Sequence, residues 1–269
     1  MTREGLTELK KWFRIYVSGY RTDNGDLRRN VDLKVKHTMN VCREVRPISR
    51  AISLPEGDLL LAESIALLHD VGRFEQYARH RTFADSRSED HAQLGLAILS
   101  RERVLEAFPP EEADLLVRAI SYHNRPTVPR GESERCILFS NLLRDADKLD
   151  ILRVVIEYYH QRPEERNEAV AIGYEESPGV SAPVALNLHR GQPVRRADVR
   201  NINDFKLLQI GWVYDLNFRP TYRAVLDRRY VQSIAETLPR TPEIEALVER
   251  AVAFLAGKCS AQHQPLVSD

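Results

Sequence analysis

Six imidazole and carboxylate side chains lie at the ends or on the apolar faces of expected helices, where the sequence otherwise predicts burial. The run "ALLHDVGR" shows the pattern, because its apolar helix formers stop abruptly at a histidine and an aspartate. Imidazole and carboxylate together are ligands for divalent ions such as Mn, Fe, Ni or Zn, and Mg is compatible with the carboxylates. The set is His37, His69, Asp70, His91, His123 and Asp147.

Each of these residues taken alone has a simpler explanation. A lone histidine on an apolar face, such as His37, is usually a hydrogen-bonded core residue, and one at a helix end interacts with the helix dipole. A carboxylate inside an apolar helix is harder to explain, because burying an isolated charge costs on the order of several kcal/mol. Six such residues together indicate a metal site, with a mixed nitrogen and oxygen shell that leaves water on the metal, as hydrolysis requires.

Helical periodicity leaves open which aspartate of "RDADKLD" faces this site. Asp145 shares a stripe with Leu142 and Leu149, whereas Asp147 lies on a stripe with Arg144. The more apolar stripe mildly favours Asp145 as the inward-facing residue.

The elements that must position these side chains are mostly helices. The expected helices cover about 6–16, 31–52, 59–68, 89–99, 109–123 and 136–159. Ser88 is the expected N-cap of the fourth helix, and Gly72 is the expected left-handed cap of the third. Residues 73–88 are polar and lack a clear period, which predicts a loop.

The amino-acid composition changes from about residue 165 to 204, where prolines and glycines become more frequent. The run "VALNLHRGQPV" alternates before a glycine and predicts a small β-hairpin near residues 180–200. Helices resume over 205–216, 221–237 and 242–255. We therefore expect an all-α protein with a single domain over 1–257. Its parts are a core at 30–160, an insertion at about 165–204 and C-terminal helices at 205–257, followed by a flexible tail at 258–269.

The amino-acid composition limits which binding partners and which cellular compartment are expected for this protein. The 269 residues contain 39 basic and 39 acidic side chains, so bulk charge does not favour a nucleic-acid polymer or a membrane surface. The charged N-terminus lacks the apolar core of a signal peptide, and three widely spaced cysteines do not suggest disulfides. We expect a cytoplasmic protein, for which a homodimer is compatible with the sequence.

The order of these residues resembles a known family. His37, the doublet in "LLHDVGR" and the aspartate in "RDADKLD" are similar to the signature of the HD-domain metal-dependent phosphohydrolase superfamily, over roughly residues 30–160. The resemblance implies an HD-domain helical bundle. It also implies that His37, His69, Asp70 and Asp147 hold a first metal, because family members place the ligand in an "AD" pair before a basic residue.

Two further histidines are similar in order to those of members that hold two metals. The resemblance implies that His91 and His123 complete a second site, which Asp70 would share. The sequence departs from the family pattern at Arg73, where many members have lysine. It departs again at Asn124, where some two-metal members have a second consecutive histidine, and this puts the second ion in doubt.

The activity implied is hydrolysis of a small phosphorylated molecule, such as a nucleotide, through metal-activated water. Asp70, Lys148 and Arg73 are the expected catalytic residues, the two cations holding phosphoryl oxygens. The segment 73–88 carries several arginines and two aromatic rings, which suits an anionic substrate with a ring and equally suits a solvated loop. The alternative function is a non-catalytic, metal-containing HD module that senses a ligand or regulates.

Overall fold

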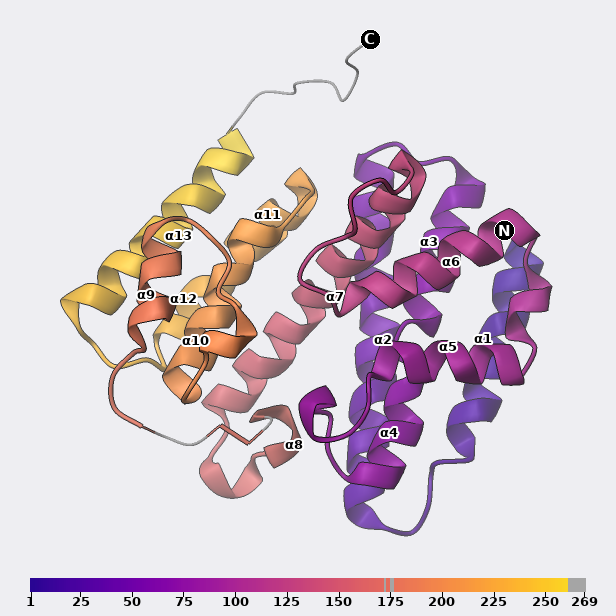
Figure 1. Cartoon of the computed structure of the whole chain (residues 1–269), viewed down its shortest axis with the longest axis horizontal. Helices are drawn as coiled ribbons and strands as arrows, with labels where there is room; N and C mark the ends of the chain where they lie inside the picture. The colour runs from indigo at the N-terminus through magenta and orange to yellow at the C-terminus, as the bar shows by residue number, and fades with distance from the viewer. Residues whose placement is uncertain (172, 175–176, 261–269) are drawn as a thin grey trace. The chain divides into compact units, whose positions relative to one another are not determined.

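A computed structural model describes residues 1–171, 173–174 and 177–260. The chain divides into two compact units, residues 1–173 and 174–269. Figure 1 shows the helices of the first unit from indigo to pink and those of the second in orange and yellow. The described residues form α-helices and short 3-10 helices and no strand, which confirms the all-α prediction. None of the described helices is long and apolar enough to cross a membrane.

Eight α-helices make up the described part of the first unit. Short 3-10 turns at Asp85–Arg87, Val104–Ala107 and Pro163–Glu165 connect some of them. The α-helices are α1 (Arg3–Ser18), α2 (Gly25–Ala51), α3 (Glu56–Leu68), α4 (Gly72–His80), α5 (His91–Arg101), α6 (Pro110–His123), α7 (Glu134–His160) and α8 (Glu168–Ala171).

Helix α3 lies at the centre of the first unit and packs against α2, α6 and α7. Every residue from Leu60 to Leu68 is buried, as expected for a helix without a solvated face. Helix α2 in turn packs along α7. The metal-ligating candidates therefore come from the end of the apolar helix α3 and from other helices of the same unit.

The expected loop at 73–88 is partly wrong, because α4 occupies its first half. Gly72 does not end α3 in a left-handed conformation; it begins α4 and lies against α5. A Cβ at Gly72 would collide with the backbone of His91 and come within 2.6 Å of the nitrogen of Gly95. The glycine thus permits the close approach of α4 to α5. The N-cap of α5 is Asp90 rather than Ser88, and its carboxylate accepts hydrogen bonds from the first turn.

The expected β-hairpin near 180–200 is also wrong, because Ala182–His189 form the helix α9. Val184 and Leu188 are four residues apart and almost fully buried, whereas Leu186 between them is 48% exposed. The alternation of apolar residues therefore came from one buried helical stripe and one exposed leucine. A proline in the first turn supports the helix, since its fixed φ suits that position.

The second unit is built from short helices. They are α9, α10 (Ile202–Gly211), α11 (Arg219–Asp227), α12 (Tyr230–Ala235) and α13 (Pro242–Ser260), with 3-10 turns at Arg196–Asp198 and Trp212–Asp215. The expected helix over 221–237 is interrupted at Arg229, which has a positive φ of 55°. Helix α13 ends at Ser260, five residues beyond the expected 255, so the first three residues of the predicted flexible tail are helical. The rest of that tail, 261–269, lies outside the described residues.

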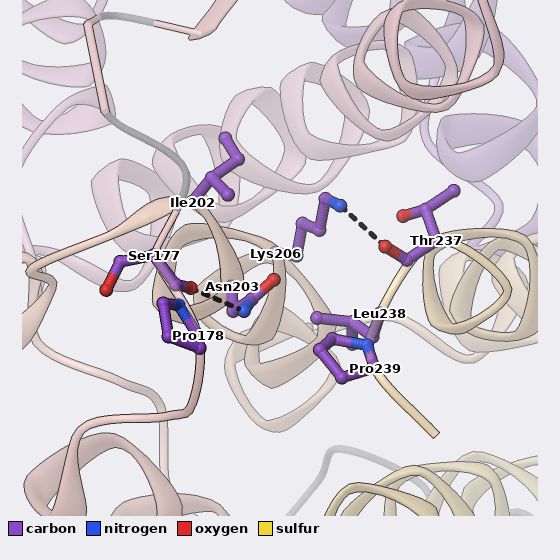
Figure 2. A pocket seen from close by; sticks show the side chains of 8 residues that line it. All are labelled: Ser177, Pro178, Ile202, Asn203, Lys206, Thr237, Leu238 and Pro239. Carbon is purple, nitrogen blue, oxygen red and sulfur yellow. Dashed lines mark hydrogen bonds between the residues drawn. The ribbon is translucent and has the colours of Figure 1, made fainter. Parts of the chain in front are cut away.

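The boundary between the two units falls inside the segment predicted to be an insertion. The single domain over 1–257 stays a prediction. Figure 2 shows a pocket of about 480 Å³ within the second unit. In it, Asn203 Nδ2 donates to the carbonyl of Ser177 at 3.1 Å, and Lys206 Nζ donates to the carbonyl of Thr237 at 2.7 Å. Both bonds tie connecting segments to α10.

Candidate metal centre

Two histidines at helix ends are oriented by the helices that they terminate. His69 directly follows α3 and its Nδ1 lies 2.8 Å from the carbonyl of Ala66, while His123 ends α6 with Nδ1 2.7 Å from the carbonyl of Ile120. A carbonyl can only accept, so Nδ1 carries a hydrogen, and the neutral form of each ring presents its lone pair at Nε2. The last carbonyls of a helix lack helical partners, and here they fix the tautomer.

Two other histidines are oriented by carboxylates. His37 on α2 has Nδ1 2.8 Å from Oδ2 of Asp150, and His91 at the start of α5 has Nδ1 2.7 Å from Oδ2 of Asp85. Burial alone would raise the pKa of Asp150, but its hydrogen bonds with His37 and Arg153 outweigh burial and lower that pKa. An ionised carboxylate also accepts only, so Nδ1 carries a hydrogen in both rings, and the neutral form of each ring presents its lone pair at Nε2. Such carboxylate–histidine pairs are typical of metal sites.

The first group of ligand atoms joins α2, the end of α3 and α7. Nε2 of His37 lies 3.1 Å from Oδ1 of Asp147 and 3.5 Å from Oδ2 of Asp70. Nε2 of His69 lies 3.7 Å from each of the same two oxygens. The structure thus brings together His37, His69, Asp70 and Asp147.

The second group lies on the other oxygen of Asp70. Oδ1 of this carboxylate is 3.5 Å from Nε2 of His91 and 3.9 Å from Nε2 of His123. The two imidazole Nε2 atoms are 2.9 Å apart. Asp70 therefore lies between two histidine pairs and directs one oxygen to each.

The donor atoms fit a cation. Nε2 of His37, Nε2 of His69 and Oδ1 of Asp147 are buried and have no hydrogen-bond partner. An unpartnered buried acceptor costs about 1–3 kcal/mol, which a bound metal ion would remove. The lone pairs of His91 and His123 repel each other at their distance unless a proton or a metal lies between them. The cluster could therefore hold one or two metal ions.

The charge of the cluster also suits a metal. Burial alone would raise the pKa of Asp70, but Lys34 and His69 outweigh burial and hold that pKa well below its ordinary value. Burial would likewise raise the pKa of Asp147, and its contacts with His37 and His69 lower it. Both groups are thus ionised near neutral pH.

A match to a family model covers the whole cluster. The model of the HD domain matches residues 35–152. The chain contains an HD domain. The predicted resemblance to the HD-domain metal-dependent phosphohydrolase superfamily is confirmed. No curated protein and no solved structure was found to match the chain.

Within the HD domain, the geometry distinguishes the two aspartates that periodicity left open. Asp147 directs Oδ1 at His37 and His69, whereas none of the possible ligand groups among the described residues contains Asp145. Asp145 is fully buried, as the mild preference of periodicity for an inward-facing residue expects, but it belongs to none of these groups. The position implied by the family resemblance agrees with the geometry.

The two predicted catalytic cations of the HD domain occupy different environments. Arg73 Nη1 donates to the carbonyl of Phe83 at 2.7 Å and to Oδ1 of Asp85 at 2.8 Å, while its Nε lies 3.5 Å from Oδ1 of Asp70. Arg73 thus links the cluster to the segment after α4. Lys148 follows Asp147 on α7 and is mostly buried. Catalytic roles for both stay predictions.

Sequence reasoning missed three residues that contact the cluster. Asp85 and Asp150 orient His91 and His37, and Lys34 Nζ donates to Oδ2 of Asp70 at 2.8 Å. The spacing of residues along the sequence could have indicated two of them, Lys34 and Asp150. Lys34 precedes His37 by three residues and Asp150 follows Asp147 by three, so each pair shares a helix face. Asp85 follows α4 in an irregular segment, and no periodicity could have indicated it.

Proposed function

We propose that the chain is a metal-dependent phosphohydrolase that hydrolyses a phosphate ester of a small molecule, nucleotides being the first class to test. The observation that carries the proposal is the convergence of four imidazole Nε2 atoms on the carboxylates of Asp70 and Asp147, with three of these atoms lacking a hydrogen-bond partner. Nitrogen and oxygen ligands without thiolates suit a divalent ion that keeps room for water.

The residues would divide between two ions that share Asp70. His37, His69, Asp70 and Asp147 would hold the first, and Asp70, His91 and His123 the second. When bound, the metal supplies an acidified water near neutral pH and offsets charge on the phosphoryl group. Burial and the charge of Arg73 lower the pKa of His91 to about 4, so its ring is neutral and able to bind a metal at neutral pH.

Cations at the edge of the cluster would hold phosphoryl oxygens. Lys34 is well suited, because its ammonium borders Asp70 while its side chain keeps 15% exposure. Arg73 Nη1 is already bound to Phe83 and Asp85, so this arginine would position the segment after α4 and face the substrate through its remaining donors. Lys148, adjacent to Asp147, would supply a further point charge.

Metal analysis together with an activity screen tests the proposal. Protein purified without chelators should contain stoichiometric transition metal, and it should release phosphate from members of a nucleotide panel when Mn²⁺ is added. Asp70→Ala should lose both metal and activity, because both ion positions use this carboxylate. Asp114→Ala is the matched control, since Asp114 is an exposed aspartate on α6.

Absence of metal together with no turnover would contradict the proposal. Stoichiometric metal without turnover of any phosphate ester in the panel would also contradict it. That second result would favour the non-catalytic sensing module instead.

A further inference from the structure

The first unit contains a cavity of about 660 Å³ that none of the six candidate metal ligands lines. Its walls come from the start of α2, the end of α4 with the residues that follow, and the segment around α8. Its size is within the range of small-molecule binding sites. The basic residues that line it are Arg29, His80, Arg81, Arg87 and Arg166.

Positive charge predominates in this cavity. Asp26 and Glu168 are its only acidic residues among the described lining. The carboxylate of Asp26 already accepts the hydroxyl of Tyr77 at 3.0 Å and the amide of Asn30 at 3.2 Å. Arg81 lies 3.9 Å from the same carboxylate, at the limit of an ion pair. The described lining therefore contains four arginines and two acidic residues, and the carboxylate of Asp26 accepts hydrogen bonds from neutral donors.

Two of the arginines, Arg29 and Arg166, are held in position by contacts with residues outside the cavity lining. Arg29 Nη2 donates to the carbonyl of Glu165 at 2.6 Å, and the guanidinium of Arg166 lies 5.4 Å from the ring centre of Tyr158. The guanidinium of Arg87 lies directly against Gly173, where a Cβ would come within 2.8 Å of it. Guanidinium groups fixed in this way lose less conformational freedom when they bind a ligand.

The cavity is separate from the metal cluster. Arg29 precedes His37 by eight residues on α2, and Arg81 follows Arg73 by eight residues along α4 and its cap. At about 1.5 Å per residue, each separation is about 12 Å. The ring of Phe83 contacts residues of both sites: it lies 5.1 Å from the ammonium of Lys34 at the cluster and 4.7 Å from the ring of Tyr77, which lines the cavity.

We propose that this cavity binds a small molecule with several phosphate-type negative charges, and that it does so without the metal centre. Arginine forks match the oxygens of phosphate groups bidentately, and several arginines around one cavity select for a ligand with more than one such group. The site is therefore additional to the candidate metal ligands, none of which lines it.

Calorimetric titration of the full chain after metal removal tests this proposal, with tripolyphosphate, inorganic phosphate and citrate as probes. Tripolyphosphate should bind at least about tenfold more tightly than inorganic phosphate, and its affinity should fall as salt is added. Binding of citrate as tight as that of tripolyphosphate would overturn the assignment to phosphate groups. No binding of tripolyphosphate would overturn the site itself.

The backbone offers a matched pair of variants for this titration. Arg81 and Arg103 both have a left-handed backbone, with φ of 53° and 57°, and both are exposed arginines, but only Arg81 lines the cavity. Glycine suits this conformation, so Arg81→Gly and Arg103→Gly should both fold. Arg81→Gly should weaken tripolyphosphate binding by about tenfold to 100-fold, the loss expected for one charge-assisted contact. Arg103→Gly should leave it unchanged.

Two further variants locate the binding. Arg29→Gln should weaken it like Arg81→Gly, whereas Lys34→Gln, at the metal cluster, should not. Equal loss in Lys34→Gln would show that the probe binds at the cluster and would overturn the proposal. Wild-type affinity in both Arg81→Gly and Arg29→Gln would overturn it as well.

Discussion

Replacing Asp150 by asparagine should disable His37 as a metal ligand without touching the cluster directly. Oδ1 of Asp150 accepts from Asn40 at 2.9 Å and from Arg153 at 2.7 Å, while Oδ2 faces Nδ1 of His37 at 2.8 Å. An asparagine must keep its oxygen toward the two donors, because its NH₂ group cannot face them. The NH₂ group then faces His37 and can only donate to Nδ1. This forces the imidazole hydrogen onto Nε2, where the metal should bind.

The size of the effect follows from this geometry. Removing the carboxylate partner of a ligating histidine typically costs 10-fold to 100-fold in metal affinity, about 1.4–2.7 kcal/mol. We expect the upper part of that range, since Asp150→Asn both removes a charge and favours the wrong tautomer of His37. The dissociation constant should be measured by competition with a chelator of known affinity, together with a thermal melt to verify folding.

A parallel variant separates the two ion positions. Oδ2 of Asp85 faces Nδ1 of His91, and its Oδ1 accepts hydrogen bonds from Arg73 at 2.8 Å and from Gln76 at 2.9 Å. Asp85→Asn should therefore move the imidazole hydrogen of His91 from Nδ1 to Nε2, as Asp150→Asn does for His37. Asp150→Asn should weaken one ion and Asp85→Asn the other. Asp114→Asn, on the exposed surface, is the control. Full metal affinity in a well-folded Asp150→Asn protein would refute the tautomer argument.

Three further predictions follow from the same contacts. Asp147→Asn should lose metal, and Asp145→Asn should keep it; the reverse in metal analysis would return the assignment to Asp145. Chelation should lower the melting temperature, because a ligand at 100 times its dissociation constant stabilises by about 2.7 kcal/mol; an unchanged melt would argue against a bound ion. Burial and the charge of Arg73 lower the pKa of His91 to about 4 in the folded protein. Between pH 6.5 and 4, this histidine is therefore protonated more in the unfolded chain than in the folded one. The stability of the metal-free protein should therefore fall on acidification by up to about 1.4 kcal/mol per pH unit from this group, and His91→Gln should flatten that slope in urea titrations.

The positions of the four histidines could be predicted because burial of an imidazole, at a helix end or on an apolar helix face, conflicts with its polarity. The side of α7 could not. This helix has buried residues on several sides, including the polar Ser140, Arg144 and Asp145, so its apolar stripe does not mark the face at the cluster. Only contacts across to α2 distinguish Asp147 from Asp145, and such contacts are not written in the periodicity of one helix.

The segment after the doublet was misread for a related reason. Helix α4 buries polar side chains, and Gln76 is fully buried. Its amide donates to Asp85, Ser88 and Glu89, each at 2.9 Å. Because α4 buries Glu75 and Gln76 beside Phe74 and Tyr77, its buried face does not show the purely apolar period on which sequence reasoning depends. The same hydrogen bonds hold Asp85 beside His91, so the part of the chain that looked irregular is the part that orients a ligand.

Asn124, the departure that put the second ion in doubt, takes a structural position that keeps the second ligand set intact. Its amide donates to Oδ1 of Asp90 at 2.9 Å, and the same oxygen caps α5 by accepting from the nitrogen of Ala92 at 2.9 Å. Because Asn124 directly follows His123 and Asp90 directly precedes His91, this bond joins the two helix ends that carry the second histidine pair. The asparagine at this position thus connects the end of α6 to the start of α5, and Asp70, His91 and His123 still lie close together.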